Sequence, residues 1–402
     1  MLTPTEAEKL VLENIVLLPA EDCPLAQAHG RVLRADIRAD RDLPPFDRVT
    51  MDGYALRASA LAAGKRNFRS EAVQAAGMRA GTLSAGPDAC IEVMTGAVLP
   101  TGADCVVPYE DTSRKGDVVQ VGEGGAKIVA GSSVHRRGSD HRKGDVILRA
   151  GCRITGREIA VAAACGCAQL SVTRLPKIAV VATGDELVEV EAIVAPHQVR
   201  RSNDYALRAS LAAAGYPQVE RFLLHDMRHE IEHQLWHIIA EFDFVLLTGG
   251  VSKGKFDFLP SELDKQGVRK VLHGVGQRPG KPFWFGVSSR QTPIFALPGN
   301  PVSAFTCFHR YVLDALAKAS GLRLTAPRPV VLSQPVKFTP KLAFFLPVKL
   351  SSGPRAEWEA TPIPGNTSGD FSSLIGTDGF VELPAEQDEF PAGYIAPFRA
   401  WV

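Results

Sequence analysis

The pattern of hydrophobic and polar positions changes twice along the chain. Between residues 175 and 324, apolar runs of strand length alternate with stretches of helical period. Such alternation predicts right-handed crossovers and a three-layer α/β domain. Residues 46–142 and 325–402 instead contain short alternating runs between glycines and prolines, which predicts a β-rich domain and an all-β C-terminal domain. Residues 1–45 and 143–174 are expected to form a small linking domain that includes an N-terminal helix.

Several helix starts are marked by residues that satisfy free backbone groups. Thr3 with Glu6, and Thr155 with Glu158, have the spacing of capping boxes. Asn300 is a plausible cap for the last helix of the α/β region. In that region we expect helices over residues 203–214, 228–242 and 301–320.

Four apolar runs in the same region have the length and residue types of buried parallel strands. They cover residues 177–183, 219–224, 242–248 and 292–297. Ligands bind just beyond the carboxyl ends of such strands. Polar residues follow these runs or lie close to them, namely Asp185, Glu186, Asp226, Lys253, Lys255, Asp257, Arg278 and Lys281. Carboxylates among basic residues predict a magnesium ion and an anionic substrate at this edge.

Composition and charge exclude several classes of function. The 402 residues include 45 Lys and Arg against 44 Asp and Glu, so no overall field attracts nucleic acid or an anionic membrane. The start of the chain lacks the basic and apolar segments of a signal peptide, and no apolar stretch is long enough to span a bilayer. Seven cysteines without regular spacing indicate reduced thiols. We therefore expect a cytoplasmic protein.

Three short motifs are poor guides to function here. Residues 229–233 match the zinc motif H-E-x-x-H, but the apolar stripe of that helix predicts a solvated histidine face instead. Residues 249–255 match G-x-x-x-x-G-K, yet Phe256 replaces the Ser or Thr that a phosphate loop needs. Residues 274–276 lack the third glycine of a dinucleotide fingerprint.

Two further turns allow more than one interpretation. Residues 297–304 place Gly299 and Pro301 at a helix start, where free N–H groups either bind an anion or merely begin a rigid helix. Asp52 and Gly53, taken alone, are more typical of a hairpin turn than of a catalytic site.

Seven motifs, in order along nearly the whole chain, strongly resemble the molybdopterin molybdenumtransferase family, known as MoeA, and the E domain of gephyrin. These motifs are Pro45-Phe46-Asp47 with Met51-Asp52-Gly53-Tyr54-Ala55, Met94-Thr95-Gly96-Ala97, Arg137-Gly138-Ser139-Asp140, Thr183-Gly184-Asp185-Glu186-Leu187, Gly249-Gly250-Val251-Ser252, Arg278-Pro279-Gly280-Lys281-Pro282 and Leu297-Pro298-Gly299-Asn300-Pro301-Val302-Ser303-Ala304.

The resemblance implies an elongated homodimer of four subdomains that inserts molybdenum from molybdate into adenylated molybdopterin, with magnesium, and releases AMP. It also implies a cleft between the α/β domain of one copy and the β-rich domain of the other. Its implied catalytic residues are Asp52, Thr95, Asp140, Glu186, Asp226 and Asp257, the last three as metal ligands. Its implied substrate-binding residues are Gly249, Gly250, Ser252, Arg278, Lys281, Pro298, Asn300, Pro301 and Ser368.

The chain departs from the family pattern at several positions. His135 stands where the family often has Arg, Arg278 replaces the usual Lys, and residues 48–50 read Arg-Val-Thr instead of Asn-Ser-Ala. Lys253 and Lys255 replace a pair that is apolar and often acidic. Arg keeps the charge of Lys but changes its donor geometry.

Alternatives stay open at this point. A tungstate insertase would need the same residues, because the two oxyanions have nearly the same size and charge. A gephyrin-like scaffold that grips a partner protein at the dimer is the other alternative. Expected partners include the adenylating enzyme of the same pathway and recipient molybdoenzymes, with no nucleic acid and no membrane.

Overall fold

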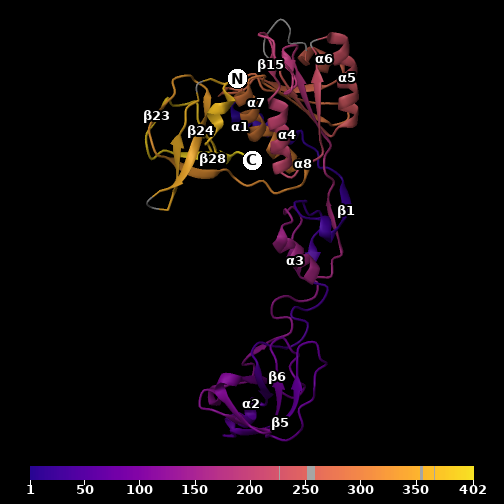
Figure 1. Ribbon diagram of the computed structural model, residues 1–402, viewed down its shortest axis with the longest axis vertical. Helices are drawn as coiled ribbons and strands as arrows, with labels where there is room; N and C mark the ends of the chain where they lie inside the picture. Colours follow the sequence, from indigo (N-terminus) through magenta and orange to yellow (C-terminus); the bar gives the residue numbers. More distant parts are fainter. Residues whose placement is uncertain (226, 251–258, 354–355, 366) are drawn as a thin grey trace.

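The computed structural model describes residues 1–225, 227–250, 259–353, 356–365 and 367–402. The chain forms an elongated molecule (Figure 1). The α/β domain and the C-terminal β domain lie together at one end, the β-rich region lies at the other, and a narrow linking region joins them. Within the described ranges, no helix combines the length and the apolar character that crossing a membrane requires.

A six-stranded sheet is the centre of the α/β domain. Its strands are β13 (Ile178–Thr183), β16 (Val219–Leu224), β17 (Phe244–Thr248), β18 (Arg269–His273), β20 (Trp284–Val287) and β21 (Pro293–Leu297). The order is β16-β13-β17-β21-β20-β18, and the first four strands are parallel. This confirms the α/β prediction. β20 and β18 extend the sheet in the antiparallel sense, which the sequence pattern did not indicate.

Helices cover both faces of this sheet. They are α1 (Pro4–Glu13), α4 (Asn203–Ala213), α5 (Arg228–Glu241), α6 (Leu259–Lys265), α7 (Pro301–Cys307) and α8 (Leu313–Ala319). Successive strand side chains point to opposite faces. Ile178 and Val180 accordingly pack with α1, α4, α7 and α8, whereas Ala179 and Val181 pack with α5 and α6. A π-helical turn, Phe308–Val312, joins α7 to α8 within the helical span predicted for 301–320.

The N-terminal helix has the expected cap but a different neighbour. The Glu6 backbone N–H donates to Thr3 Oγ1 at 3.3 Å, and the Glu6 carboxylate accepts from the Thr3 N–H at 2.8 Å. The buried side chains of α1, which include Ala7 and Val11, belong to the core of the α/β sheet. The placement of this helix in the linking domain is therefore corrected, because its apolar stripe packs against α8 and β18.

The β-rich region contains a second six-stranded sheet, of order β7-β4-β6-β5-β9-β8. These strands, with one short helix, are β4 (Gly53–Leu56), β5 (Asn67–Gln74), β6 (Ala89–Val93), β7 (Cys105–Pro108), β8 (Thr112–Lys115), β9 (Val118–Val121) and α2 (Ala58–Ala62). The strand β3 (Arg48–Val49) pairs with β10 (Val134–His135), whereas β4 pairs with β6 and β7. Asp52 and Gly53 therefore do not form a hairpin turn, because the strands on their two sides have different partners.

The linking region consists of two strand pairs and one helix. These elements are β1 (Ala20–Pro24) with β12 (Gln169–Thr173), β2 (Ile37–Arg38) with β11 (Val146–Leu148), and α3 (Gly156–Ala164). The predicted capping box is present, because the Thr155 N–H donates to Glu158 Oε2 at 2.8 Å. All seven cysteines of the chain are free thiols, as expected.

The C-terminal domain is a closed β-barrel. Its strands are β22 (Arg328–Leu332), β24 (Ala343–Ser352), β25 (Trp358–Pro362), β26 (Gly379–Leu383) and β28 (Ile395–Ala400), and a short pair, β23 (Val336–Lys337) with β27 (Glu389–Phe390), lies beside them. The barrel closes because β24 pairs with both β25 and β26. The short strand β19 (Gln277–Arg278) also pairs with β24, so a segment of the α/β domain is fixed against the barrel.

Candidate functional site

Three parallel strands of the α/β sheet end side by side, at Thr183, Thr248 and Leu297. Gly249 and Gly250 follow β17 with φ angles of +94° and +65°. A Cβ atom on Gly249 would lie 2.7 Å from the Thr183 carbonyl oxygen. Only glycine fits where this loop passes the end of β13, so the two predicted glycines permit the close approach of neighbouring loops.

Glu186 lies just beyond β13. A Cβ atom on Gly184 would be 2.5 Å from Glu186 Oε2, which shows that the carboxylate folds back over the end of the strand. Asp185 is exposed, and its Oδ1 lies 3.6 Å from His225 Nδ1. Two carboxylates at one strand end provide the oxygen donors that magnesium prefers.

Two of the three predicted metal ligands, Asp226 and Asp257, lie outside the described residues, as do the predicted substrate-binding residue Ser252 and the basic residues Lys253 and Lys255. Within the described ranges, no group of three His, Cys, Asp or Glu side chains could hold a metal ion. Glu186 therefore fits magnesium by donor type alone.

The segment that carries Glu186 is tied to α4 by buried charges. After Glu186 the chain forms β14 (Leu187–Val188), which pairs with β15 (Val199–Arg200). The Arg201 guanidinium, 5% exposed, donates to Glu189 Oε1 at 2.7 Å and to Asp204 Oδ2 at 2.6 Å. Asp204 is fully buried and also accepts from Arg221 at 2.9 Å. These ion pairs compensate the buried charges of Arg201 and Asp204 and connect the segment after Glu186 to α4.

The turn after β21 connects the α/β domain to the barrel. Asn300 Nδ2 donates to Ser368 Oγ at 2.8 Å, and the Val302 N–H donates to the Ser368 carbonyl oxygen at 3.0 Å. Asn203 Nδ2 donates to the Gly299 carbonyl oxygen at 2.8 Å. Asn300 is the N-cap residue of α7, as predicted, although its side chain donates to Ser368 and makes no capping hydrogen bond. Since Ser368 takes the Val302 N–H, this donor is not free for an anion.

These contacts border a cleft of about 710 Å³ between the α/β domain and the barrel. Its lining includes five of the predicted substrate-binding residues, namely Arg278, Lys281, Pro298, Asn300 and Ser368. Arg278 ends β19 and Lys281 lies in the turn between β19 and β20, whereas the other three come from the Pro298 turn and the barrel. The structure thus brings together residues that are up to 90 positions apart in the sequence, from Arg278 to Ser368.

Aromatic rings of the barrel line the cleft beside Arg278, which pairs with Phe344 in the register of β19 with β24. The Phe338 and Phe344 rings stack with their centroids 4.1 Å apart, and the Arg278 guanidinium lies 5.9 Å from the Phe338 centroid. A cleft of this volume, lined by Arg278, Lys281 and Lys337 together with aromatic and proline residues, suits an anionic ligand that carries a planar ring. Sequence reasoning missed Phe338 and Phe344, because the barrel pattern did not show which face meets the α/β domain.

Asp52 and Thr95 form a second group next to β4 and β6, in the β-rich region at the other end of the molecule (Figure 1). Asp52 Oδ1 accepts from the Thr95 backbone N–H at 2.6 Å and from its hydroxyl at 2.8 Å. These two bonds favour the charged carboxylate and hold the pKa of Asp52 below its usual range. Asp52 is therefore ionised at neutral pH. Its side chain is exposed to solvent.

Asp140 belongs to the same end of the chain and has its own partners. The Asp140 N–H donates to the Leu43 carbonyl oxygen at 3.0 Å, and Asp140 Oδ1 lies 2.8 Å from His135 Nε2. β3 connects the two carboxylate groups, because Val49 exchanges backbone bonds with Gly96 and Ala97 on one side and pairs with β10 on the other.

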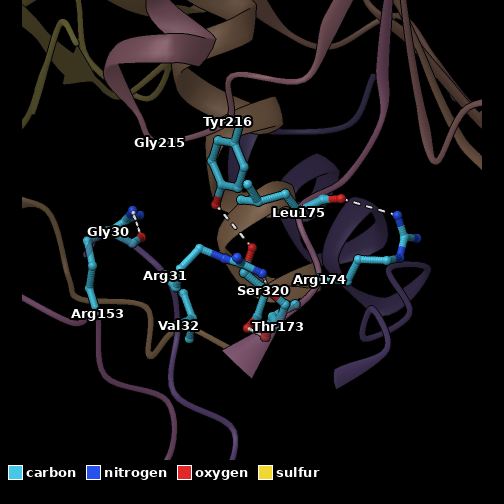
Figure 2. A pocket seen from close by; sticks show the side chains of 10 residues that line it. All are labelled: Gly30, Arg31, Val32, Arg153, Thr173, Arg174, Leu175, Gly215, Tyr216 and Ser320. Carbon is cyan, nitrogen blue, oxygen red and sulfur yellow. Dashed lines mark hydrogen bonds between the residues drawn. The ribbon is translucent and has the colours of Figure 1, made fainter. Parts of the chain in front are cut away.

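Figure 2 shows a small cavity where the linking region meets the α/β domain. Its volume is about 10 Å³, which leaves room for about one water molecule and for no substrate. Arg31 Nη2 donates to the Thr173 carbonyl oxygen at 2.7 Å, and Arg153 Nη1 donates to the Gly30 carbonyl oxygen at 3.0 Å. These hydrogen bonds hold the linking region against the α/β domain, and the cavity is too small to be part of the candidate site.

The histidine motif on α5 does not belong to the site either. His233 and His237 are exposed, with ring centroids 4.7 Å apart, while Ile231 and Leu235 are buried on the other face of the helix. The solvated face predicted for these two histidines is confirmed. The side chain of His229 lies outside the described part of the helix.

Comparison with known families and structures supports this description. Residues 2–166 match the MoeA N-terminal region (domain I and II), residues 179–318 match a probable molybdopterin binding domain, and residues 329–399 match the MoeA C-terminal region (domain IV). The fold is that of a crystal structure described as a molybdopterin biosynthesis MoeA protein from Pyrococcus horikoshii, with a TM-score of 0.83 and 26% identity over the full length of both chains.

Two named relatives have the same extent. A molybdopterin molybdenumtransferase of Synechocystis is 41% identical over 93% of both chains, and one of Staphylococcus epidermidis is 29% identical over 97% of this chain and 93% of the relative. The chain therefore belongs to the molybdopterin molybdenumtransferase family, and it is a transferase of molybdenum cofactor biosynthesis.

Proposed function

We propose that this chain inserts molybdenum from molybdate into adenylated molybdopterin and releases AMP. The observation that carries the proposal is the cleft, in which cationic, polar and aromatic side chains from two domains converge. The family to which the chain belongs indicates the general chemistry. The cleft supports the more specific proposal that the substrate is anionic and carries a planar ring.

The basic residues of the cleft address the main electrostatic difficulty of this reaction. Molybdate and the pyrophosphate-linked substrate are both anions and repel one another. Arg278 and Lys281 hold fixed positive charge in the cleft, and Arg278 adds a planar donor array that suits an oxyanion. Ser368 and Asn300 add neutral donors across the domain boundary. The cleft thus binds oxyanions and orients them against its aromatic wall.

Magnesium is the proposed metal. Glu186 would hold it together with Asp226 and Asp257, which lie outside the described residues. When bound, magnesium would neutralise the charge that develops as the phosphoanhydride opens. The glycines at 249 and 250 let the loop after β17 pack closely against Thr183 and Leu259 at this edge.

A homodimer explains where the remaining residues act. Asp52, Thr95 and Asp140 belong to the β-rich region, and that region lies at the far end of the elongated chain from the α/β domain and the barrel (Figure 1). One copy therefore does not bring its own carboxylate group to its own cleft in this arrangement, and we propose that a second copy supplies it. The four-subdomain division, the cytoplasmic location and the interactions with an adenylating enzyme and recipient molybdoenzymes stay predictions.

The test is molybdate-dependent AMP release from purified adenylated molybdopterin. Wild type is compared with Asp226→Asn and Asp257→Asn for the metal, and with Lys281→Met for the cleft. Lys349→Met is the control, because Lys349 is exposed on β24 and does not line the cleft. The proposal predicts AMP release by wild type and the control only. Equal rates in all five proteins would reject the assigned residues, and no release by wild type would reject the function.

A further inference from the structure

The two departures from the family pattern at positions 48 and 135 contact each other. Arg48 and His135 are direct partners in the antiparallel pairing of β3 with β10. Arg48 Nη2 lies 3.1 Å from His135 Nδ1, and His135 Nε2 lies 2.8 Å from Asp140 Oδ1. One imidazole therefore connects a guanidinium to the carboxylate of a proposed site residue.

The chemistry of the three groups fixes the tautomer of His135. A guanidinium has donors and no acceptor, so His135 Nδ1 accepts the hydrogen bond from Arg48. The ring proton then resides on Nε2 and is donated to Asp140. The carboxylate is thus oriented through a neutral ring, which in turn is held by a permanent positive charge.

Neighbouring arginines do not take over this role. Arg136 Nη1 donates to Asp47 Oδ2 at 2.9 Å, and Arg137 Nε donates to Asp42 Oδ2 at 2.9 Å. Each is thereby engaged by a carboxylate other than Asp140. In the described part of the chain, His135 is the side chain that hydrogen-bonds the Asp140 carboxylate.

The backbone and the imidazole constrain Asp140 in complementary ways. The Asp140 N–H donates to the Leu43 carbonyl oxygen, which fixes the position of the residue. The side chain is half exposed, and only Oδ1 contacts His135. This arrangement leaves Oδ2 and the open side of the carboxylate to a ligand. We propose that His135 is a positioning residue, held by Arg48, that fixes the Asp140 carboxylate for the reaction; this inference rests on the proposed function.

If His135 had only a structural role, its loss would affect folding and the reaction rate to a similar, small extent. Ion pairs and hydrogen bonds at this exposure contribute little to stability. Breaking the contact should therefore leave folding nearly unchanged, whereas misplacing a reacting carboxylate can reduce the rate by as much as roughly 10²-fold.

Nitrogen-15 NMR of the histidine side chains tests the geometry without any turnover. The His135 signals are assigned by comparison with His135→Gln. The proposal predicts a neutral ring that is protonated on Nε2, and it predicts that Arg48→Met loses this single tautomer. A ring protonated on Nδ1, or a mixture of tautomers that Arg48→Met leaves unchanged, would overturn the proposal.

AMP release then tests the role. His135→Leu removes both contacts and should lower kcat at least about tenfold with little change in KM, because orientation is lost while the cleft is intact. His135→Gln should recover most of the rate, since its amide can accept from Arg48 and donate to Asp140. Arg114→Gln is the control, because it breaks the exposed Arg114–Glu92 pair in the same region without touching Asp140.

The possible results separate this inference from the proposed function. If wild type is active and His135→Leu is equally active, the positioning role is wrong and the function stands. If His135→Gln is as impaired as His135→Leu, the hydrogen bonds to Arg48 and Asp140 do not determine the rate. The positioning role of His135 is then also wrong. If wild type releases no AMP although the Nε2–H tautomer is present, the function fails, and the positioning role fails with it while the contact itself is confirmed.

Discussion

The cleft and the Asp52 end of the molecule are built in opposite ways. The cleft lies between two domains and is lined by Arg278, Lys281 and stacked aromatic rings. At the other end, Asp52 and Asp140 stand on exposed loops beside the short strand β3. The predicted site residues that carry charge are cations in the cleft and carboxylates in the other region, where Arg48, Arg136 and Arg137 lie nearby. The cleft half therefore carries the cations for an anionic substrate, whereas the Asp52 and Asp140 carboxylates lie in the other region, and the proposed site requires both.

The two regions also differ in how they are supported. Behind the cleft, His309 is 3% exposed and packs against Phe305 and Trp401, with ring centroids 4.3 and 5.0 Å away. Its Nδ1–H donates to the Phe305 carbonyl oxygen at 2.8 Å, and Nε2 accepts from the Val402 N–H at 3.1 Å. The Asp52 carboxylate instead depends on two bonds from Thr95. Packing supports the first region and local hydrogen bonding the second.

The largest expected effect is the loss of a cleft cation. Lys281→Met should reduce molybdate-dependent AMP release roughly 10²–10³-fold, the range found when one preorganised group that stabilises a transition state is removed. Steady-state rates over a range of molybdate concentrations provide the measurement. A rate within threefold of wild type would show that the cleft is not the anion site.

Acid should lower the free energy of unfolding of the part of the protein that contains the cleft, because His309 is buried there as a neutral ring. Burial lowers the pKa of His309 to about 4 from an ordinary value of 6.5. The unfolded chain therefore takes up a proton below pH 6.5 while the folded chain does not. The stability that the neutral ring provides is fully present above pH 6.5 and is lost as pH falls toward 4, by about 3 kcal/mol at 1.36 kcal/mol per pKa unit.

Denaturant unfolding at pH 7 and at pH 4.5 measures this effect. His309→Gln should show a smaller loss between the two pH values than wild type, whatever its absolute stability. His273→Gln, which replaces an exposed histidine of β18, is the control and should follow wild type. Identical pH slopes for wild type and His309→Gln would contradict the account.

The contact between the α/β domain and the barrel should have a smaller effect. Ser368→Ala removes the acceptor of the Asn300 side chain but keeps the backbone bond to Val302. A neutral hydrogen bond contributes about 0.5–1.5 kcal/mol, so KM for molybdate should rise by up to about tenfold. Ser372→Ala, which removes a bond to Asp370, is the control and should leave KM unchanged. Equal KM values for both variants would mean that the contact is irrelevant to binding.

The smallest expected effect concerns Thr95. Thr95→Val removes the hydroxyl but keeps the backbone N–H that contributes most to the lowered pKa of Asp52. The pKa of Asp52 should therefore rise but stay below its usual range, while Thr95→Ser should match wild type. A carboxyl group whose pKa is lower in the folded than in the unfolded protein stabilises the fold at every pH above its unfolded-state pKa. This stabilisation is lost only in acid, as pH falls through the folded-state pKa. Carbon-13 NMR titration of Asp52 is the measurement, and an unchanged value in Thr95→Val would contradict it.

The α/β domain could be predicted from the sequence because its signals are local. Four apolar runs became four parallel strands, and Gly249 and Gly250 have the positive φ angles that a tight loop requires. The convergence of Arg278, Lys281 and Ser368 in one cleft followed from the family motifs, not from periodicity.

Other features depend on contacts between distant segments and have no local signal. The pairing of β19 with β24, the position of α1 on the α/β core and the wall formed by Phe338 and Phe344 are of this kind. The contact between Arg48 and His135 could have been suspected, because both depart from the family pattern. Only the strand register shows that they meet.

Complementation between two inactive chains tests most directly whether the two regions belong to one site. Asp52→Asn and Lys281→Met should each be nearly inactive. After unfolding and refolding an equal mixture, about half of the dimers contain one chain of each kind, and one of their two sites has both groups intact. The account predicts that AMP release returns to about one quarter of the wild-type rate. A mixture as inactive as the separate variants, although mixed dimers have formed, would contradict it.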